Sequence, residues 1–392
     1  MLTAARPLYA QYLPSTPLTF ADGRLVFGGD VQASLAPPDD EAWFNYTDYE
    51  HDALRMFRWS VAGEWRIAPR LAFLGELRAE NIDAPRASAL YVRARPFARV
   101  PLDIQAGRIP PTFGAFGRRV YSTDNLLIGY PLAYQYLLSI RPDAIPATSD
   151  ELLRMRARGW QSSFSVGSQE AATGVSPINA FRWDTGIEVR LGTDRAQAAV
   201  AFTNGTLCDP RVGDNNDGKQ FSARFQVQPL FGLIVGVSGA RGAWLARDLE
   251  DLVAPGQQDA RQQVLGFDAE YSRGHWLVRG EAIRSTWDMP GVASAADAMN
   301  LVATSGWVEG RYRLTPRLYV AGRAERLTFS RIQSAATGAY LRWEAPVSRL
   351  ELGGGVYVQR NLVARLSVQS NHRDGGRVRE RTIVSTQVLY WF

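Results

Sequence analysis

Apolar and polar residues alternate in steps of two through almost the whole chain. In the last segment, Val384, Val388 and Tyr390 fall on one side of an extended chain, and Ser385 and Gln387 fall on the other. A period of two predicts β-strands with one apolar face each. The pattern recurs near residues 24–35, 57–67, 71–80, 90–96, 102–108, 181–191, 196–203, 220–228, 232–241, 263–272, 276–287, 302–314, 318–327, 348–358, 362–371 and 381–392.

The connections between these segments alternate between short and long. The short ones lie near 68–70, 97–101, 192–195, 229–231, 273–274, 315–317 and 359–361. An even strand number with alternating connections predicts an all-β fold: a closed antiparallel transmembrane barrel of about sixteen strands, with short periplasmic turns and long extracellular loops. A soluble β-sandwich also has many strands, but nothing in that fold requires its loop lengths to alternate. Eighteen strands is the main alternative, because Thr19–Phe20 and residues 163–166 could each add one.

The hydropathy of the chain agrees with strands that cross a membrane. The most continuous apolar stretch, 230–240, is far shorter than the ~18 residues that a membrane helix needs. Mean hydropathy is −0.20, which suits a barrel because only every second residue faces lipid. In a soluble protein the apolar rows would need a partner sheet, whereas rows that face lipid need none.

Both ends of the chain carry their own signals. The first twenty residues lack the apolar core of a signal peptide, so we expect that such a peptide has been removed. The chain closes on Tyr390, Trp391 and Phe392, as an aromatic belt at the membrane rim would, and a terminal aromatic resembles the sorting signal of bacterial outer-membrane proteins. The expected organisation is a periplasmic segment, 1–23, followed by one barrel domain, 24–392.

The polar rows of the predicted strands carry many charged residues. An arginine at the midplane of the lipid face would cost roughly 2–4 kcal/mol, so these rows are expected to line a water-filled lumen. The predicted pore-lining residues are Arg58, Arg66, Arg78, Arg93, Arg95, Arg182, Arg190, Arg224, Arg279, Arg311, Arg323, Glu64, Glu76, Glu188, Glu281 and Glu309, with Asp103 and Glu325 in the same rows. The formal charge is +5, and Lys219 is the only lysine. This arginine surplus predicts a mild anion preference; alternatively, the charges pair with one another and stabilise the wall.

The longest interruption of the pattern, residues 109–180, is too long for an idle connection. Its apolar stretch 126–140 must be buried, and Ser149 to Glu151 predict the start of a short helix. Folded inward, this loop would narrow the lumen; the alternative is an extracellular cap packed on itself. The residues expected at a constriction are Arg118, Arg119, Tyr130 and Tyr134.

The sequence offers little for catalysis, metals or cofactors. Cys208 is the only cysteine, and the three histidines are scattered. No G-x-S-x-G or phosphate-binding Walker motif is present. The stretch VGDNNDGK, 212–219, does not fit the calcium-loop spacing, although a calcium ion near 209–217 stays open. Because the arginines alternate with acids, nucleic-acid binding is disfavoured. We therefore expect no enzyme, no cofactor and no metal site.

The stretch GRIPPTFGAFGRR, 107–119, resembles an element of bacterial porins of the phosphate-selective porin O/P type, in which Gly107, Pro111, Phe113 and Gly114 match a Gly-x-x-x-Pro-x-Phe-Gly motif. In that family the motif lies where a strand enters the large loop. The resemblance implies a sixteen-stranded homotrimer with a basic channel. However, the chain lacks the lysine clusters of the phosphate-selective members, which puts phosphate selectivity in doubt.

The expected function is therefore a porin of the bacterial outer membrane, a passive channel for small hydrophilic solutes with a mild preference for anions. The expected partners are the lipid bilayer, lipopolysaccharide or another outer-leaflet lipid, and small anions or hydrophilic solutes. The alternative is a plugged barrel that acts as a scaffold or binding partner in a cell-envelope complex. Single-channel conductance discriminates between the two.

Overall fold

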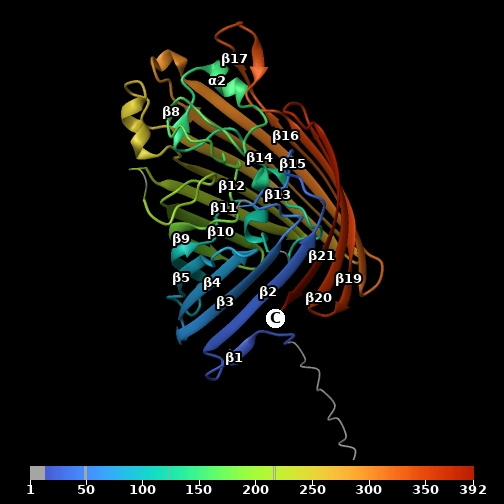
Figure 1. The fold of residues 1–392 in the computed structure, drawn as a ribbon. Helices are drawn as coiled ribbons and strands as arrows, with labels where there is room; N and C mark the ends of the chain where they lie inside the picture. Colours follow the sequence, from blue (N-terminus) through green and yellow to red (C-terminus); the bar gives the residue numbers. More distant parts are fainter. Residues whose placement is uncertain (1–13, 48–50, 122, 215, 217) are drawn as a thin grey trace, which may run out of the picture.

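The computed structural model describes residues 14–392 except 48–50, 122, 215 and 217. Its main body is a closed antiparallel barrel whose strands lie oblique to the long axis (Figure 1). The sixteen barrel strands are β2 (Leu25–Leu35), β3 (Phe57–Ala68), β4 (Leu71–Glu80), β5 (Arg86–Ala94), β6 (Leu102–Ile109), β9 (Asp184–Gly192), β10 (Ala196–Thr203), β11 (Gln220–Leu230), β12 (Leu233–Ala243), β13 (Arg261–Arg273), β14 (Trp276–Met289), β15 (Met299–Arg313), β16 (Leu318–Phe329), β19 (Val347–Gln359), β20 (Leu362–Arg373) and β21 (Glu380–Trp391). The predicted fold class is confirmed.

The barrel closes between its first and last strands. β2 pairs antiparallel with β21, in the register Asp30 opposite Trp391. Phe392 extends this ladder, since its N–H donates to the Gly29 carbonyl at 3.0 Å and its carbonyl accepts the Gly29 N–H at 3.1 Å. The large loop is bridged in the same way, because β6 pairs directly with β9. Each barrel strand thus has two neighbours, which leaves no strand edge exposed to lipid.

Neither segment proposed for an eighteen-stranded barrel adds a strand to the closed ring: β1 (Leu18–Phe20) joins the barrel sheet only by pairing with β2. It forms a hairpin on β2 through the turn that contains Asp22 and Gly23. The residues near 163–166 contribute only to β8 (Val166–Gly167), which pairs with β7 (Ala144–Ile145) inside the large loop. A further hairpin, β17 (Arg331–Gln333) with β18 (Tyr340–Arg342), lies in the connection before β19. Sixteen is therefore the strand number of the barrel.

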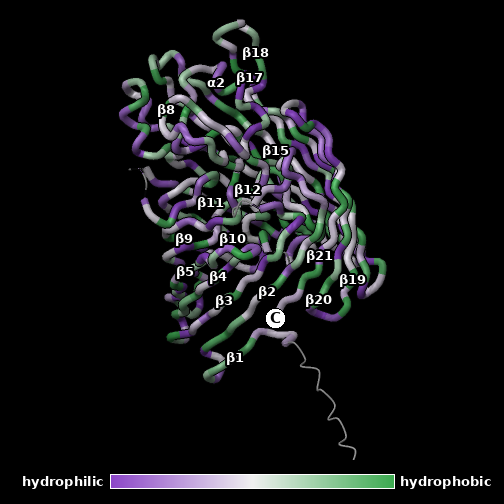
Figure 2. The backbone as a smooth tube through the Cα atoms, in the orientation of Figure 1, coloured by the Kyte–Doolittle hydropathy of each residue, from purple (hydrophilic) through white to green (hydrophobic). Residues whose placement is uncertain are grey.

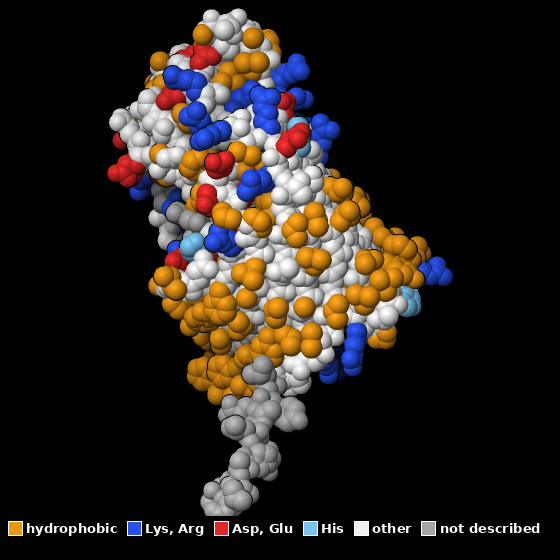
Figure 3. Space-filling view, turned by 45° about the vertical axis from the view of Figure 1, so that its right-hand side comes forward, with side chains coloured by type: hydrophobic (Ala, Val, Ile, Leu, Met, Phe, Trp, Pro, Cys, Tyr) orange, Lys and Arg blue, Asp and Glu red, His pale blue; other side chains and the backbone are white. Residues whose placement is uncertain are grey.

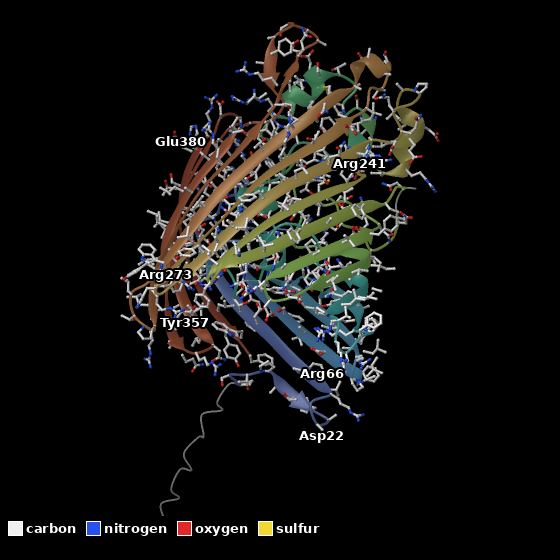
Figure 4. The ribbon with its side chains drawn as sticks, turned by 180° about the vertical axis from the view of Figure 1, so that it is seen from behind. Asp22, Arg66, Arg241, Arg273, Tyr357 and Glu380 are labelled. Atoms are coloured by element: carbon white, nitrogen blue, oxygen red, sulfur yellow. The ribbon has the colours of Figure 1, made fainter. Side chains whose placement is uncertain are left out.

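The two ends of the barrel differ as the loop lengths predict. Figure 4 shows the two ends by labelled residues. The end with the short turns carries Asp22, Arg66, Arg273 and Tyr357, and the end with the long loops carries Arg241 and Glu380. The large loop spans residues 110–183. It holds η1 (Phe116–Arg118), α1 (Leu132–Gln135) and α2 (Ser149–Arg154), while η2 (Arg247–Leu252) and η3 (Ala295–Asp297) lie in later loops. The part of the chain that the structure describes contains no helix long and apolar enough to cross a membrane.

The predicted short helix after residue 148 is present, with a different cap. Thr148, not Ser149, is the N-cap of α2, and its hydroxyl accepts the Glu151 N–H at 3.3 Å. A threonine in extended backbone suits this position, because its oxygen can satisfy an N–H group of the first helical turn.

The two faces of each strand differ in chemistry. Hydrophobic and hydrophilic residues alternate along the strands (Figure 2), and hydrophobic side chains form a band around the visible outer face below a charged upper region (Figure 3). On β19, outward Leu350 and Leu352 are about half exposed, whereas the neighbouring inward residues, Arg349 and Glu351, are buried. Aromatic pairs such as Trp276 with Tyr312, at 4.7 Å between ring centroids, border the band at the short-turn end.

Candidate pore and its constriction loop

The loop 110–183 turns into the barrel at the GRIPPTFG motif. Gly107, near the end of β6, has φ +128°, and a Cβ there would lie 2.4 Å from the Leu90 carbonyl oxygen, so only glycine fits at this position. Beyond it, Thr112 donates to Glu188 on the wall, and Phe113 is fully buried against Gly266 of β13. The motif is therefore the hinge that directs the loop inward.

Immediately after the hinge, the loop backbone bonds to wall side chains. Gly114 has φ +63°, and its N–H donates to Ser238 Oγ at 3.0 Å. Glu281 of β14 accepts the Ala115 N–H at 3.1 Å and the Tyr134 hydroxyl at 2.7 Å. One inward carboxylate thus holds both the start of the loop and α1. The extracellular-cap alternative for this part of the loop is wrong, because its contacts are with the inner wall.

Tyr130 connects the loop to two separate regions of the wall. Its hydroxyl accepts from Arg58 Nη1 of β3 at 2.6 Å, and its carbonyl accepts from Arg349 Nη1 of β19 at 3.1 Å. Arg119 pairs with Glu270 of β13. Three of the four expected constriction residues, Arg119, Tyr130 and Tyr134, therefore contact the inner wall. The backbone of Arg118 lies in η1, but its side chain lies outside the described part of the structure.

A network of alternating charges lies beneath the loop on β14, β15, β16 and β19. At its centre Arg323 contacts three carboxylates: Glu309 at 3.2 Å, Glu325 at 3.2 Å and Glu351 at 2.8 Å. All four side chains are at most 1% exposed. Arg279 extends the network through Glu309 at 2.7 Å. Buried charges of this kind are tolerated only when they are paired and hydrogen-bonded, as they are here.

Backbone N–H groups of the loop complete the bonding of this network. Gly129 donates to Glu351 Oε1 at 3.0 Å, and Leu132 donates to Glu325 Oε2 at 2.5 Å. A Cβ at position 129 would lie 2.5 Å from Glu351 Oε2, so glycine allows this close approach. The network therefore attaches the loop to the wall.

A second polar cluster lies on β2 to β5. Arg58 pairs with Glu80, and Arg78 contacts Glu76 at 2.9 Å. Tyr121 of the loop donates to Glu76 Oε2 at 2.6 Å, so this cluster also binds the loop. A smaller pair, Arg224 with Asp268 at 2.5 Å, follows on β11 and β13. These inward charges are paired with one another, as the alternative interpretation expects; that the pairs stabilise the wall stays a prediction.

The predicted pore-lining residues fall into two groups, those that are buried and those that are at least partly exposed to solvent. The buried ones lie under the loop: Arg58, Arg78, Arg224, Arg279, Arg323, Glu76, Glu188, Glu281 and Glu309. Those with access to solvent are Arg66, Arg93, Arg95, Arg190, Arg311 and Glu64, toward the short-turn end, and Arg182 in the large loop. Which of them line a path for solutes stays a prediction.

Several inward residues were missed by sequence reasoning. Arg349, Glu351, Arg365 and Arg373 are all buried inside the barrel on β19 and β20. The alternating pattern could have identified them, because all four lie in the polar rows of the predicted segments 348–358 and 362–371 or, as Arg373 does, at the next position of the row. Asp268, the partner of Arg224, was missed in the same way on β13.

Two cavities lie at opposite ends of the barrel. At the short-turn end a cavity of about 560 Å³ is lined by charged side chains that include Arg24, Arg66, Arg70, Arg93 and Arg95. Glu64 and Asp22 are the acids in this lining. At the long-loop end a cavity of about 230 Å³ lies between loops and reaches Tyr134, Phe181, Arg182 and Arg211.

Comparison with solved structures gives the fold. OmpT of Vibrio cholerae, outer-membrane expressed, matches with a TM-score of 0.57 at 9% identity, covering 96% of this chain and 100% of that one. The anion-selective porin of Comamonas acidovorans matches with a TM-score of 0.56 at 8% identity over 94% and 99%. A trimer form of the Vibrio cholerae OmpT matches with 0.54 at 9% identity over 94% and 99%. The chain folds as a porin-like barrel. No protein-family model and no curated protein matches the sequence.

Potential metal ligands do not converge in the described part of this porin-like barrel, where no three His, Cys, Asp or Glu side chains form a cluster. In the polar stretch 212–219, Asp214 pairs with Lys219, and positions 215 and 217 lie outside the described residues. The histidines are used separately: His51 contacts Asp83 at 3.1 Å, and His372 contacts Glu380 at 3.3 Å. The absence of catalytic and metal sites stays a prediction.

The loop 36–56 also folds into the long-loop end, and one of its carboxyl groups is sensitive to pH. Asn45 donates to Gln369 Oε1 of the wall at 2.8 Å, and Leu54 is fully buried. Burial, together with the negative charges of Asp39 and Asp40, raises the pKa of Asp52 to about 7. In the unfolded loop the same pKa is 3.8, so the folded loop binds the proton more tightly.

We expect the folded loop to lose stability as the pH rises from about 4 to about 7, because Asp52 must then ionise in a buried place. Asp52→Asn should remove this dependence and stabilise the loop at pH 8, by on the order of 2 kcal/mol. Protease sensitivity of loop 36–56 as a function of pH measures the effect. Asp259→Asn, in an exposed position on another loop, is the control. An unchanged pH profile in Asp52→Asn would contradict the assignment.

Proposed function

We propose that this porin-like barrel resides in a bacterial outer membrane and acts as a passive channel for small hydrophilic solutes, with a mild preference for anions. The observation that carries the proposal is the arginine-rich cavity at the short-turn end. Its lining holds Arg24, Arg66, Arg70, Arg93 and Arg95 against Glu64 and Asp22. Fixed positive charge around a water-filled mouth raises the local concentration of anions.

The charges of this mouth are only partly compensated. Arg93 contacts Glu64 at 3.0 Å and Asp103 at 4.0 Å, and Arg95 contacts Asp103 at 3.1 Å. Two carboxylates, those of Glu64 and Asp103, thus pair with three arginines. The side chains of Arg66 and Arg95 remain more than half exposed. Exposed pairs of this type contribute only about 0–1 kcal/mol to stability. The excess of arginine therefore adds little to the stability of the barrel, which supports a role in attracting anionic solutes.

Conductance of the purified barrel in planar lipid bilayers tests the channel function. Steady single-channel currents that scale with salt concentration support the proposal, and silent insertion contradicts it. The second candidate, a plugged scaffold, is favoured by one observation: the mid-barrel charges such as Arg323 and Glu351 are at most 1% exposed beneath the inward loop. A barrel that inserts but carries no current would support that function.

Charge reversal at the short-turn mouth tests the anion preference. In a salt gradient, Arg93→Glu with Arg95→Glu should shift the reversal potential toward cation selectivity, because the mouth then carries net negative charge. Arg273→Glu is the control: Arg273 ends β13 at the same end of the barrel, on the outward row. A reversal potential that is the same in the double variant and the original protein removes both arginines from the selectivity mechanism.

The solved structures support a porin-like barrel but not the phosphate-selective O/P type specifically; that resemblance rests on the motif at 107–114 alone and stays a proposal. Specificity for phosphate is not supported, because the single lysine, Lys219, lies beyond the barrel wall and pairs with Asp214. We further propose a homotrimer, as in the trimer form of the Vibrio cholerae OmpT. Its mass in detergent, measured by light scattering, tests the oligomeric state.

A further inference from the structure

The outer wall carries a groove whose two ends differ in chemistry. It has a volume of about 900 Å³ and crosses β13, β14, β15, β16, β19 and β20. Its floor consists of small outward residues: Ala269, Gly280, Ala282, Gly306 and Ala324. Large apolar side chains, Phe267, Tyr271, Val278, Val308 and Leu350, form its sides. Small residues between larger ones leave a depression in the apolar band.

The strand register gives the direction of the groove. Phe267 lies opposite Ala282, Ala282 opposite Gly306, and Gly306 opposite Arg326. The row continues from Arg326 through Ser348 to His372. Phe267 lies in the middle of β13, whereas His372 is next to the last residue of β20 at the long-loop end. The groove therefore climbs from the middle of the apolar band to its long-loop rim.

The upper end of the groove is cationic. Arg326 is an outward, exposed residue of β16 in the groove lining. Arg284, outward and exposed on β14, lies just beyond the lining: it is two residues from Ala282, which is level with Arg326 two strands, or about 10 Å, away. Neither guanidinium has a hydrogen bond or ion pair with another described residue. His372 at the same rim is paired with Glu380 at 3.3 Å. An unpaired arginine on the lipid face is costly unless an anion meets it.

We infer that this groove binds one anionic lipid of the leaflet on the long-loop side, with an acyl chain along the small-residue floor and the headgroup phosphate on Arg326 and Arg284. The apolar floor accepts hydrocarbon, and the two arginines complement a negative headgroup at the height where the band ends. This inference rests on the membrane location proposed above, but not on the conduction of solutes.

Lipid retention by the intact barrel tests the inference. The barrel is purified in detergent, incubated with phosphatidylglycerol or phosphatidylcholine, and examined by native mass spectrometry. We expect preferential retention of phosphatidylglycerol, and about tenfold weaker retention in Arg326→Gln with Arg284→Gln, equivalent to about 1.4 kcal/mol, because both positive charges that face the headgroup are lost. The matched control is Arg241→Gln, an exposed outward arginine of β12 outside the groove; it should retain the lipid as the original protein does.

Gly306→Leu, which fills the floor while leaving both arginines in place, should also weaken retention. Equal retention of the two lipids, or unchanged phosphatidylglycerol binding in the double arginine variant, overturns the inference. Displacement of the lipid by inorganic phosphate would also overturn it, as would a change of oligomeric state in Gly306→Leu with lipid binding unchanged. Conductance of the same variants separates the two proposals: a conducting barrel that retains no lipid refutes only the lipid site.

Discussion

Replacing Arg323 with methionine should destabilise the barrel by about 3–5 kcal/mol, the cost of breaking a buried charge network by removing one partner. Methionine fills much of the same space but leaves the carboxylates of Glu309, Glu325 and Glu351 without their central cation. Glu309 keeps Arg279, while Glu351 keeps only hydrogen bonds such as that from Gly129. The resulting repulsion acts in a place that water does not reach.

The midpoint of urea-induced unfolding, followed by tryptophan fluorescence in detergent, measures this loss. The control is Arg66→Met, since Arg66 pairs with Glu64 on the same inner face but is about half exposed; it should cost less than about 1 kcal/mol. If Arg323→Met unfolds at the same urea concentration as the control variant, the network does not stabilise the barrel.

Valine in place of Gly114 should displace the entrance of the loop and increase single-channel conductance. The position has φ +63°, which a β-branched residue adopts only with strain of about 1–3 kcal/mol. In addition, a Cβ there would lie 2.3 Å from Glu281 Oε1 and 2.5 Å from the Tyr134 hydroxyl. Both bonds to Glu281 would have to break, which frees the loop from β14.

Gly310→Val is the matched control for this variant. Gly310 lies on β15, and a Cβ there meets no other atom within 4 Å, so conductance should not change. Conductance equal to that of the original protein in Gly114→Val would show that this attachment does not limit current. A plugged barrel gives a different result, because Gly114→Val would then create a current where the original protein carries none.

Much of the wall could be predicted from the sequence. The predicted segment 318–327 is found as β16 (Leu318–Phe329), and the segment 362–371 as β20 (Leu362–Arg373). The reason is that a strand of a membrane barrel meets lipid on one side only. The polarity of each residue in the strand therefore indicates whether it faces lipid or the interior of the barrel. Boundaries were missed by a few residues where a strand continues beyond the apolar band, as β15 does at Met299.

The candidate site was predicted less completely. The alternating pattern predicts that Arg323 and Arg93 both point into the barrel. In the structure, however, the side chain of Arg323 is 1% exposed and that of Arg93 is 23% exposed. Their difference comes from the loop 110–183, which covers one and not the other. The inward course of the loop depends on contacts between residues far apart in the chain, such as Tyr134 with Glu281, and no local pattern records them.

The sequence by itself therefore determined which rows of residues face outward, an even number of about sixteen strands and the two unlike ends of the barrel, because these follow from a two-residue period and from loop length; the structure decided between sixteen and eighteen. Only the tertiary structure decided which inward charges meet water, which ones form a buried network, and how the GRIPPTFG hinge seats the loop. The physical reason is that facing inward is a local property of a strand, whereas burial depends on what the rest of the chain places above it.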